Sequence, residues 1–476
     1  MNKLIVCIGW FLFSMPGLRA QAPEPRTDSM AGVVFQYIKT GNWQAVHHLF
    51  DSTLQKRVPL PVFTNQFNQL QRTALGNIQK ISFDRRQNRT HFYKADFDEA
   101  SLLLLLTLND TGSLSGFALR KYFVPGQDSV IGTSNSLRTP LDRKVDSIVR
   151  SHIKISYAAG MSIGIITGDS TLFYGYGETE KGNAFVPTPN TLFEIGSITK
   201  TFTSLLLALE INKGRIHPDS CISAYLPDSL PRMEWKGIPV TIRMLSNHTS
   251  GIPSLPLNFK TVPGFDAANP YKGYTKEMLF RYFKSFTPYR EPGRSHEYSN
   301  MAVALLGNIL EQVNRSNWPV LVHQQILEPL KLQHTGTLPS RIKGIRYTTG
   351  YKGTGETTSH WTMQAFAPAG ALHSTAADMI QYARFVLSPG KGPLPEALEY
   401  TLRPGFTVSA TSKIGLGWYL VTVKGKQYIT HSGGTGGYRS TLVIDRNSKK
   451  AVVVLSNTAN EVDPVAFQLL EYVSSF

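Results

Sequence analysis

The sequence is poor in cysteine, since its 476 residues include only Cys7 and Cys221. Cys7 lies in an N-terminal segment with the pattern of a secretory signal peptide: a lysine, an apolar run over residues 4–15 and small residues near 20–22. We expect residues 1–22 to be removed and the mature protein to be periplasmic or secreted, without a membrane span. Cys221 would then have no partner for an internal disulfide, so burial of apolar side chains must hold the fold together.

Sequence signatures of several ligand classes are also absent. No G-x-x-x-x-G-K phosphate loop occurs, and the histidines show no metal-site spacing with Cys, Asp or Glu, so we expect neither a metal nor a cofactor. The formal net charge is +16 at pH 7, but Lys and Arg are scattered, without zinc-finger or helix-turn-helix spacing. We therefore expect a generally basic surface and no nucleic-acid partner.

The length of the chain predicts more than one domain. Residues 26–123 predict a small α+β domain, with helices over 28–40, 43–56 and 60–75 and strands over 78–84, 90–97, 101–108 and 114–123. This order resembles the cone-shaped domains of the nuclear-transport-factor-like group, which implies an accessory unit; substrate binding and dimerisation are both open roles for it. Residues 124–140 are rich in Gly, Ser, Thr, Asn and Pro and predict a linker, and 141–476 form the second predicted domain.

The most informative chemical pattern is Ser197-Ile-Thr-Lys200. S-x-x-K occurs four times in the chain, but only Ser197 opens a segment, 201–212, that is apolar nearly all round, as in a helix buried in a core. Residues three apart share one face of a helix, so Lys200 can reach the Ser197 hydroxyl. A lysine that burial keeps uncharged can take the proton of a serine nucleophile.

Two further motifs follow along the chain. Tyr298-Ser-Asn300 is the only Y-x-N and precedes an apolar helix over 302–310; a tyrosine hydroxyl near a lysine can shuttle protons, and an asparagine can orient an amine or a substrate amide. His431-Ser-Gly-Gly-Thr-Gly-Gly437 precedes the strand 438–445, and glycines at a strand edge expose backbone N–H donors to an oxyanion. Taken singly, the two motifs also fit a packed turn tyrosine and a flexible hairpin.

In this order the three motifs resemble the signature of the serine β-lactamase and penicillin-binding-protein superfamily, in the branch with class C β-lactamases, D-aminopeptidases, DD-peptidases and related esterases. Residues 247–253, 369–376 and 415–418 match the same branch. The resemblance covers about 142–476 and implies an α+β fold: a five-stranded antiparallel sheet flanked by helices, with a helical region beside it and the active site between them.

The resemblance also implies roles for single residues. Ser197 would be the acyl-accepting nucleophile, Lys200 its proton acceptor, and Tyr298 the group that passes protons to the leaving group and helps activate the deacylating water. The backbone N–H groups of Ser197 and Gly434 would form the oxyanion hole. The substrate-binding residues would be Asn300, His431, Gly433, Gly434 and Arg439.

One position departs from the family pattern. The third motif of true β-lactamases usually begins with lysine, whereas here it begins with His431, which is mostly neutral near pH 7. We therefore expect weak β-lactam hydrolysis. Arg439 offers a replacement anion site, but we favour a solvated strand residue there. A literal K-T-G, Lys39-Thr-Gly41, precedes Ser197 and lies in the other predicted domain.

The motifs together predict an exported serine hydrolase that forms an acyl-enzyme on Ser197. Its substrate would be an ester or amide in a small molecule, a D-amino-acid peptide or a cell-wall fragment. One alternative is a true β-lactamase or penicillin-binding DD-peptidase, and another is a non-catalytic binding or sensor protein on the same fold. The presence of serine, lysine and tyrosine together favours an enzyme.

Overall fold

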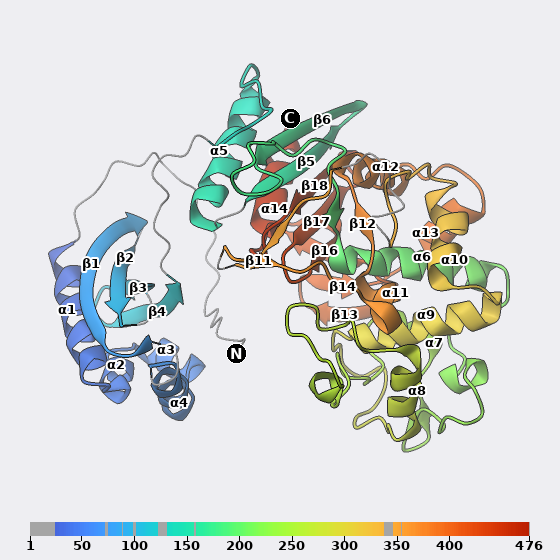
Figure 1. The fold of residues 1–476 in the computed structure, drawn as a ribbon, viewed down its shortest axis with the longest axis horizontal. Coiled ribbons are helices and arrows are strands. Elements are labelled where there is room, and N and C mark those ends of the chain that lie inside the picture. The colour runs from blue at the N-terminus through green and yellow to red at the C-terminus, as the bar shows by residue number, and fades with distance from the viewer. Residues whose placement is uncertain are drawn as a thin grey trace. The chain divides into compact units, whose positions relative to one another are not determined.

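The computed structural model describes residues 24–71, 75–87, 89–98, 101–121, 131–156, 159–337, 346–353 and 355–475. The chain divides into two compact units between Gln127 and Asp128 (Figure 1). The predicted signal peptide, residues 1–22, and residues 124–130 of the predicted linker lie outside the described residues. Within the described ranges, no helix is long and apolar enough to cross a membrane.

The first unit combines four helices with a four-stranded antiparallel sheet. Its helices are α1 (Pro25–Lys39), α2 (Trp43–His48), α3 (Ser52–Arg57) and α4 (Leu60–Leu70). Its strands, paired in the order in which they occur, are β1 (Ile78–Gln87), β2 (Thr90–Phe97), β3 (Ser101–Leu108) and β4 (Leu114–Lys121). An aromatic cluster fills the space between helices and sheet: Trp43, Phe50, Phe63, Phe67 and Phe117.

The helix predicted over 43–56 is two helices. Asp51 begins the second one, because its carboxylate accepts the N–H of Leu54 at 2.8 Å. Its own N–H donates to the carbonyl of Leu114 in β4. The break is therefore set by a contact with a strand about 60 residues away, which periodicity in the sequence cannot reveal.

The second unit is built on an eight-stranded antiparallel sheet of order β13-β14-β15-β16-β17-β18-β5-β6. The strands are β5 (Gly160–Thr167), β6 (Ser170–Gly177), β13 (Phe406–Ser409), β14 (Ser412–Ile414), β15 (Tyr419–Val423), β16 (Lys426–Gly434), β17 (Arg439–Asp445) and β18 (Lys450–Ser456). The expected α+β fold with an antiparallel sheet is confirmed, but the expected count of five strands is too low. The short strands β13, β14 and β15 extend the sheet by successive hairpin pairing beyond β16.

Helices cover both faces of this sheet. Successive residues of β18 point to opposite faces, and both faces are apolar, so the strand is buried throughout. Val452 and Val454 pack with α5 (Pro140–Ser156) and α14 (Asp463–Val473) on one face. Val453 and Leu455 pack in the larger core on the other face, which includes α6 (Thr199–Asn212) and α12 (Ala376–Leu387).

Further helices and turns make up the helical region beside the sheet (Figure 1). The helices and turns are η2 (Gly196–Ile198), η3 (Ile222–Tyr225), α7 (Ile242–Ser246), η4 (Phe259–Thr261), α8 (Lys276–Lys284), α9 (Asn300–Asn314), α10 (Trp318–Val322), η5 (His323–Leu327), η7 (Gln364–Phe366), α11 (Ala367–Gly370) and α13 (Pro393–Thr401). Three two-stranded ribbons pair β7 (Phe193–Glu194) with β12 (His373–Ser374), β8 (Glu234–Trp235) with β9 (Ile238–Pro239), and β10 (Gly350–Tyr351) with β11 (Thr357–Thr358).

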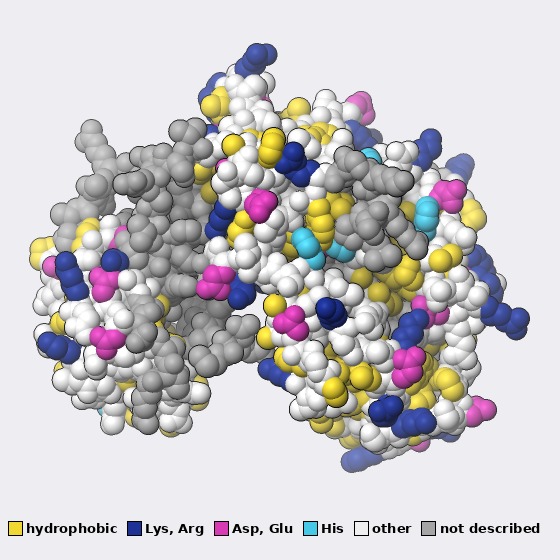
Figure 2. All heavy atoms as spheres, in the orientation of Figure 1, with side chains coloured by type: hydrophobic (Ala, Val, Ile, Leu, Met, Phe, Trp, Pro, Cys, Tyr) yellow, Lys and Arg dark blue, Asp and Glu magenta, His cyan; other side chains and the backbone are white. Residues whose placement is uncertain are grey.

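Residues 131–139, which were predicted to be part of a linker, belong to the second unit. Thr133 forms a bridge with Tyr176 in β6, and the Asn135 amide donates to the Tyr176 hydroxyl and to the carbonyl of Asp142. On the face drawn in Figure 2, Lys and Arg side chains are scattered among Asp and Glu over both units. The basic charge on this face is thus distributed rather than gathered in one patch.

Candidate active site

Ser197 lies in the 3₁₀ turn η2, between β7 and α6. It is the one residue between positions 191 and 210 that is not buried. The preceding Gly196 has φ +48°, and a Cβ at this position would lie 2.6 Å from the backbone nitrogen of Gly434. Glycine meets both requirements, because it adopts positive φ at low cost and lets the end of β16 approach the serine closely.

Lys200 is fully buried on the first turn of α6 and points to Ser197. Its Nζ lies 2.9 Å from Ser197 Oγ, 2.7 Å from Asn300 Oδ1 and 2.6 Å from the carbonyl oxygen of Ala369. Burial lowers the pKa of Lys200 well below its ordinary value, because the charged ammonium loses its hydration there. The structure therefore brings together the serine and the lysine that the sequence paired.

Tyr298 contacts the same serine. Its hydroxyl donates to Ser197 Oγ at 2.6 Å, and its ring centroid lies 4.7 Å from Lys200 Nζ. Burial raises the pKa of Tyr298, so the phenol keeps its proton. The ring of His248 packs on Tyr298 at 4.4 Å, and His248 Nδ1 accepts the N–H of Ser299 at 3.2 Å. His248 is thus a buried, hydrogen-bonded histidine that holds the second motif in place.

Asn300 is the first residue of α9, whose N-cap Ser299 accepts the N–H of Ala302 at 2.9 Å. Its Oδ1 faces the Lys200 amine, and its Nδ2 donates to the Tyr271 hydroxyl at 3.3 Å. With its amide fixed in this orientation by Tyr271, Asn300 presents an acceptor to the lysine. The second motif therefore reaches the lysine through Asn300 and the serine through Tyr298.

His431 lies on β16, and its ring is almost fully buried. Its Nδ1 lies 2.8 Å from the carbonyl oxygen of Ser432, and because a carbonyl only accepts, Nδ1 carries the hydrogen. Nε2 then carries a lone pair, and it is buried without a hydrogen-bond partner among the described residues. Burial, with a smaller contribution from Lys200, lowers the pKa of His431 to about 3. The third motif thus contributes a neutral acceptor instead of a cation.

The glycines that follow bring β16 against the nucleophile segment. A Cβ at Gly433 would lie 2.0 Å from the carbonyl oxygen of Ile195 and 2.5 Å from Ser440 Oγ, so no larger residue fits without movement. Gly434 is exposed, and its nitrogen lies beside Gly196, the neighbour of Ser197. The two backbone N–H groups predicted for the oxyanion hole therefore belong to segments in direct contact.

The side chain of Arg439 is less exposed to solvent than the sequence led us to expect. It is half-buried, and its Nη1 donates to the carbonyls of Thr435 and Tyr438 at 3.0 and 2.9 Å. A solvated strand residue was the favoured expectation, and this is wrong, because the guanidinium turns back to close the 435–438 loop. Nη1 would also be 2.6 Å from a Cβ at Gly434. Substrate binding by Arg439 stays a prediction.

The other copies of these motifs lie in unrelated places. Ser151 donates to its own helix at Ser147, residues 388–391 follow the end of α12, and residues 340–343 lie outside the described residues. A literal G-x-S-x-G over 160–164 runs along β5, where Ser162 donates to the carbonyl of Thr188, so it is not the strand-to-helix elbow of α/β-hydrolases. Lys39-Thr-Gly41 ends α1 in the first unit.

Two residues that contact the catalytic groups were not predicted from the sequence. Ala369 acts through its backbone carbonyl, which no side-chain motif can reveal, although it begins the matching segment 369–376. Tyr271 lies in the loop before α8, where no periodicity or motif marks it. Its ring is buried against Phe259, Trp361 and Phe366, with centroids 5.0 to 5.2 Å apart.

Comparison with known proteins agrees with this geometry. The family model described as Beta-lactamase matches residues 145–472, which is more than half of the chain. The chain belongs to the β-lactamase family. It is accordingly a serine hydrolase of the β-lactamase and penicillin-binding-protein superfamily, as the three motifs predicted. The cone-like interpretation of residues 26–123 stays a prediction.

Relatives within this family carry several activities in their names. The chain is 27% identical over 334 residues to the D-alanyl-D-alanine-carboxypeptidase/endopeptidase AmpH of Escherichia coli K12, covering 67% of this chain and 83% of AmpH. It is 28% identical over 282 residues to a β-lactamase of Pseudomonas fluorescens, covering 59% of this chain and 74% of that protein. The octameric penicillin-binding protein homologue of Pyrococcus abyssi shares the fold, with a TM-score of 0.63 at 23% identity over 70% of this chain and 77% of the other.

Proposed function

We propose that this β-lactamase-family protein hydrolyses an ester or amide through an acyl-enzyme on Ser197. The observation that carries the proposal is the set of partners around the Lys200 amine. A neutral amine has two N–H groups and one lone pair. The two carbonyl oxygens, of Asn300 and Ala369, can take the two N–H groups. The lone pair then faces the Ser197 hydroxyl, as a proton acceptor must.

The steps follow from these contacts. Lys200 takes the proton of Ser197 as Oγ attacks the substrate carbonyl carbon. The N–H groups of Ser197 and Gly434 stabilise the resulting oxyanion, and one such donor is typically worth about 3–4 kcal/mol of barrier lowering. Tyr298, which keeps its proton because burial raises its pKa, gives this proton to the leaving oxygen or nitrogen and regains one from Lys200. In deacylation the same groups act in reverse on a water molecule.

The third motif bears on the substrate class. His431 presents a lone pair at Nε2, and its lowered pKa keeps it neutral over the physiological range. A substrate carboxylate would gain nothing from this neutral ring, because the ring offers it no positive charge. We infer that the favoured substrates are neutral at the position next to His431. Candidates are small esters, peptide amides and cell-wall fragments without a free carboxylate there.

A second candidate function is that of a β-lactamase or penicillin-binding DD-peptidase. The observation in its favour is that relatives sharing 27 and 28% identity are named as a D-alanyl-D-alanine carboxypeptidase/endopeptidase and a β-lactamase. This function needs an anchor for a substrate carboxylate, and Arg439 is the candidate cation next to Gly434. Export through the predicted leader, residues 1–22, would place either activity outside the cytoplasm, where cell-wall peptides lie.

The test is a substrate panel with a matched active-site variant. Nitrophenyl esters, D-amino-acid amides and a chromogenic cephalosporin are incubated with the wild-type chain and with Ser197→Ala, and intact mass reports the acyl-enzyme. We expect ester turnover and a transient acyl adduct in the wild type, and neither in Ser197→Ala. Ser197→Ala removes one part-buried hydroxyl and leaves the backbone and the apolar core unchanged, so its unfolding temperature should be close to wild type. Ester turnover retained in the variant would refute the proposal.

A further inference from the structure

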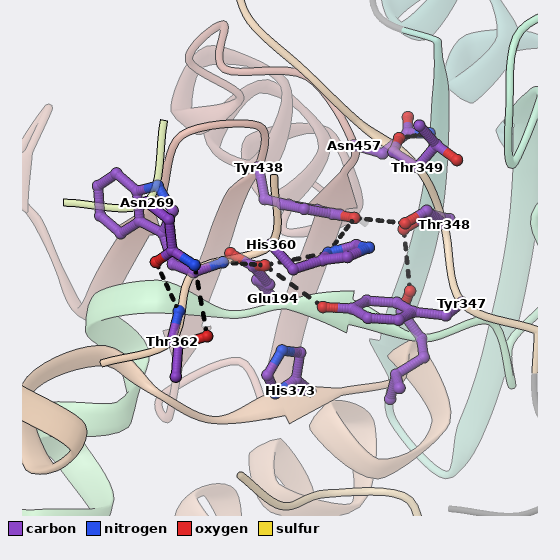
Figure 3. Close-up of polar contacts among 12 residues, drawn as sticks. Glu194, Asn269, Tyr347, Thr348, Thr349, His360, Thr362, His373, Tyr438 and Asn457 are labelled. Carbon is purple, nitrogen blue, oxygen red and sulfur yellow. Dashed lines mark hydrogen bonds and ion pairs between the residues drawn. The ribbon is translucent and has the colours of Figure 1, made fainter. Parts of the chain in front are cut away.

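A buried carboxylate lies three residues before the nucleophile. Glu194 is on β7, in register with His373 of β12, and is 3% exposed. Its Oε1 accepts the N–H of Trp361 at 3.0 Å, lies 3.2 Å from His360 Nδ1 and accepts the Tyr347 hydroxyl at 3.3 Å. All three partners belong to the segments 346–353 and 355–366; Figure 3 shows the side chains of Tyr347 and His360 turned toward Glu194.

The imidazole of His360 stacks on the ring of Tyr347 and lies beside the ring of Tyr438. Its centroid lies 3.9 Å from that of Tyr347 and 5.7 Å from that of Tyr438, with both pairs nearly parallel (Figure 3). The Tyr438 hydroxyl donates to the carbonyl of Thr348 and so accepts from His360 Nδ1 at 3.2 Å. The Nδ1 hydrogen is therefore shared between Tyr438 and the Glu194 carboxylate, which ties this stack to β7 and to the turn that precedes β17.

Trp361 and Thr362 also contact the loop that precedes α8. The Trp361 indole N–H donates to the carbonyl of Ala268 at 3.1 Å, and the N–H of Thr362 donates to Asn269 Oδ1 at 2.9 Å (Figure 3). Two residues further on, Tyr271 packs its ring on Trp361 and accepts from the Asn300 amide.

These contacts form a closed circuit around the catalytic groups. It runs from Glu194 through 360–362 to 268–271, from Tyr271 to Asn300, and from Asn300 through Lys200 to Ser197, which is covalently joined to Glu194 three residues away. A misplacement of about 1 Å in a reacting group can cost about a hundredfold in rate. A chain of hydrogen bonds and ring contacts that ends on Asn300, the acceptor of the Lys200 amine, is therefore a device for orienting that amine.

We propose that Glu194 is a positioning residue for the acyl-transfer reaction: its carboxylate anchors residues 360–362, and through Tyr271 this anchor sets the orientation of Asn300 toward Lys200. The inference rests on the proposed function, since it concerns the rate at which Ser197 is acylated. Without the Glu194 carboxylate, residues 360–362 are held less firmly. Lys200 and Ser197 are then less well aligned, so the rate of Ser197 acylation falls.

Asp378 provides a matched control within the same chain. It is also a buried carboxylate, and like Glu194 it accepts a backbone N–H and a hydroxyl from a distant segment, those of His334 and Thr335, both at 2.7 Å. A histidine ring lies beside each carboxylate, His334 Nδ1 being 3.7 Å from Asp378. Asp378→Ala thus removes equivalent contacts on α12, outside the circuit.

The experiment measures the rate at which a fluorophosphonate probe labels Ser197 in the full chain, together with kcat, KM and the unfolding temperature. Glu194→Ala should slow labelling and kcat by about 10- to 100-fold. Glu194→Gln, whose amide oxygen still accepts from Trp361, should recover part of the loss. Tyr271→Phe removes only the hydroxyl at the other end of the circuit. In the double variant, the loss of labelling rate should be smaller than the product of the two single losses, because both substitutions break the same network.

The outcomes separate this inference from the function on which it rests. A wild-type chain that the probe does not label would overturn the proposed function and the inference together. Normal wild-type labelling would leave the function intact. Two results would then overturn the inference alone: an equal loss of labelling rate in Asp378→Ala at equal thermal destabilisation, or a double variant whose loss equals the product of the two single losses.

Discussion

Replacing Gly433 by alanine tests the placement of the oxyanion hole without touching a reactive side chain. Gly433 has no positive φ, so the backbone itself tolerates alanine. The added Cβ would lie 2.0 Å from the carbonyl oxygen of Ile195, whereas carbon and oxygen normally approach no closer than about 3.3 Å. The end of β16 must therefore retreat from the nucleophile strand by about 1 Å, and it carries the N–H of Gly434 with it.

The expected loss of kcat follows from the geometry that an oxyanion donor needs. Such a donor acts at about 2.7–3.1 Å from the developing charge, and its loss lowers kcat by about 10²- to 10³-fold. A retreat of about 1 Å removes most of this interaction, so we expect Gly433→Ala to lower kcat by about 10²-fold. The overpacked core contact should also cost about 1–3 kcal/mol of unfolding free energy.

The assay compares the acylation burst on a nitrophenyl ester with thermal unfolding. Gly336→Ala is the control, because a Cβ at Gly336 meets nothing within 4 Å and its φ is not positive. It should leave the burst rate and the unfolding temperature unchanged. If Gly433→Ala is destabilised as expected but keeps a burst rate within about threefold of wild type, the assignment of the Gly434 N–H to the oxyanion hole is wrong.

Two further predictions concern the proton-transfer groups. Because burial lowers the pKa of Lys200, the unfolded state binds more protons than the folded state between that lowered value and the ordinary 10.5. The unfolding free energy should therefore rise with pH there, by about 1.4 kcal/mol per pH unit from this one group, and Lys200→Met should remove that slope in denaturant titrations at several pH values. Tyr298→Phe should lower kcat by about 10²- to 10⁴-fold for an amide, whose leaving group needs a proton, and much less for a nitrophenyl ester. Equal losses on both substrates would contradict a role for Tyr298 in leaving-group protonation.

The elements that the sequence predicted well are those whose pattern is local. Strands such as 160–167 alternate toward two buried faces, and the helix that begins near Lys200 is apolar all round, so both are visible in a short window. The resemblance carried by the three motifs also implied that Ser197, Lys200 and Tyr298 act together, and the structure brings them into contact.

What the sequence could not reveal depends on contacts between distant segments. The break at Asp51 requires β4. The orientation of Arg439 is a local exception, because the carbonyls of Thr435 and Tyr438 are near in sequence and come within reach of the guanidinium only once the turn has formed. Tyr271 and the carbonyl of Ala369 join the site from segments without a chemical pattern. Glu194 was visible in the sequence next to the nucleophile, but its partners lie more than 150 residues away.

The neutral third motif and the neutral lysine belong to one electrostatic arrangement. Lys200 must be unprotonated to accept the serine proton, and in this site burial is the cause of its lowered pKa. A permanent cation in place of His431 would lower that pKa further by repulsion, and it would also bind a substrate carboxylate beside the amine. With His431 neutral, a bound carboxylate would instead favour the charged form of Lys200 and weaken the base. A neutral substrate leaves the lysine unprotonated until it takes the serine proton, which is why the histidine and an uncharged substrate group are expected together.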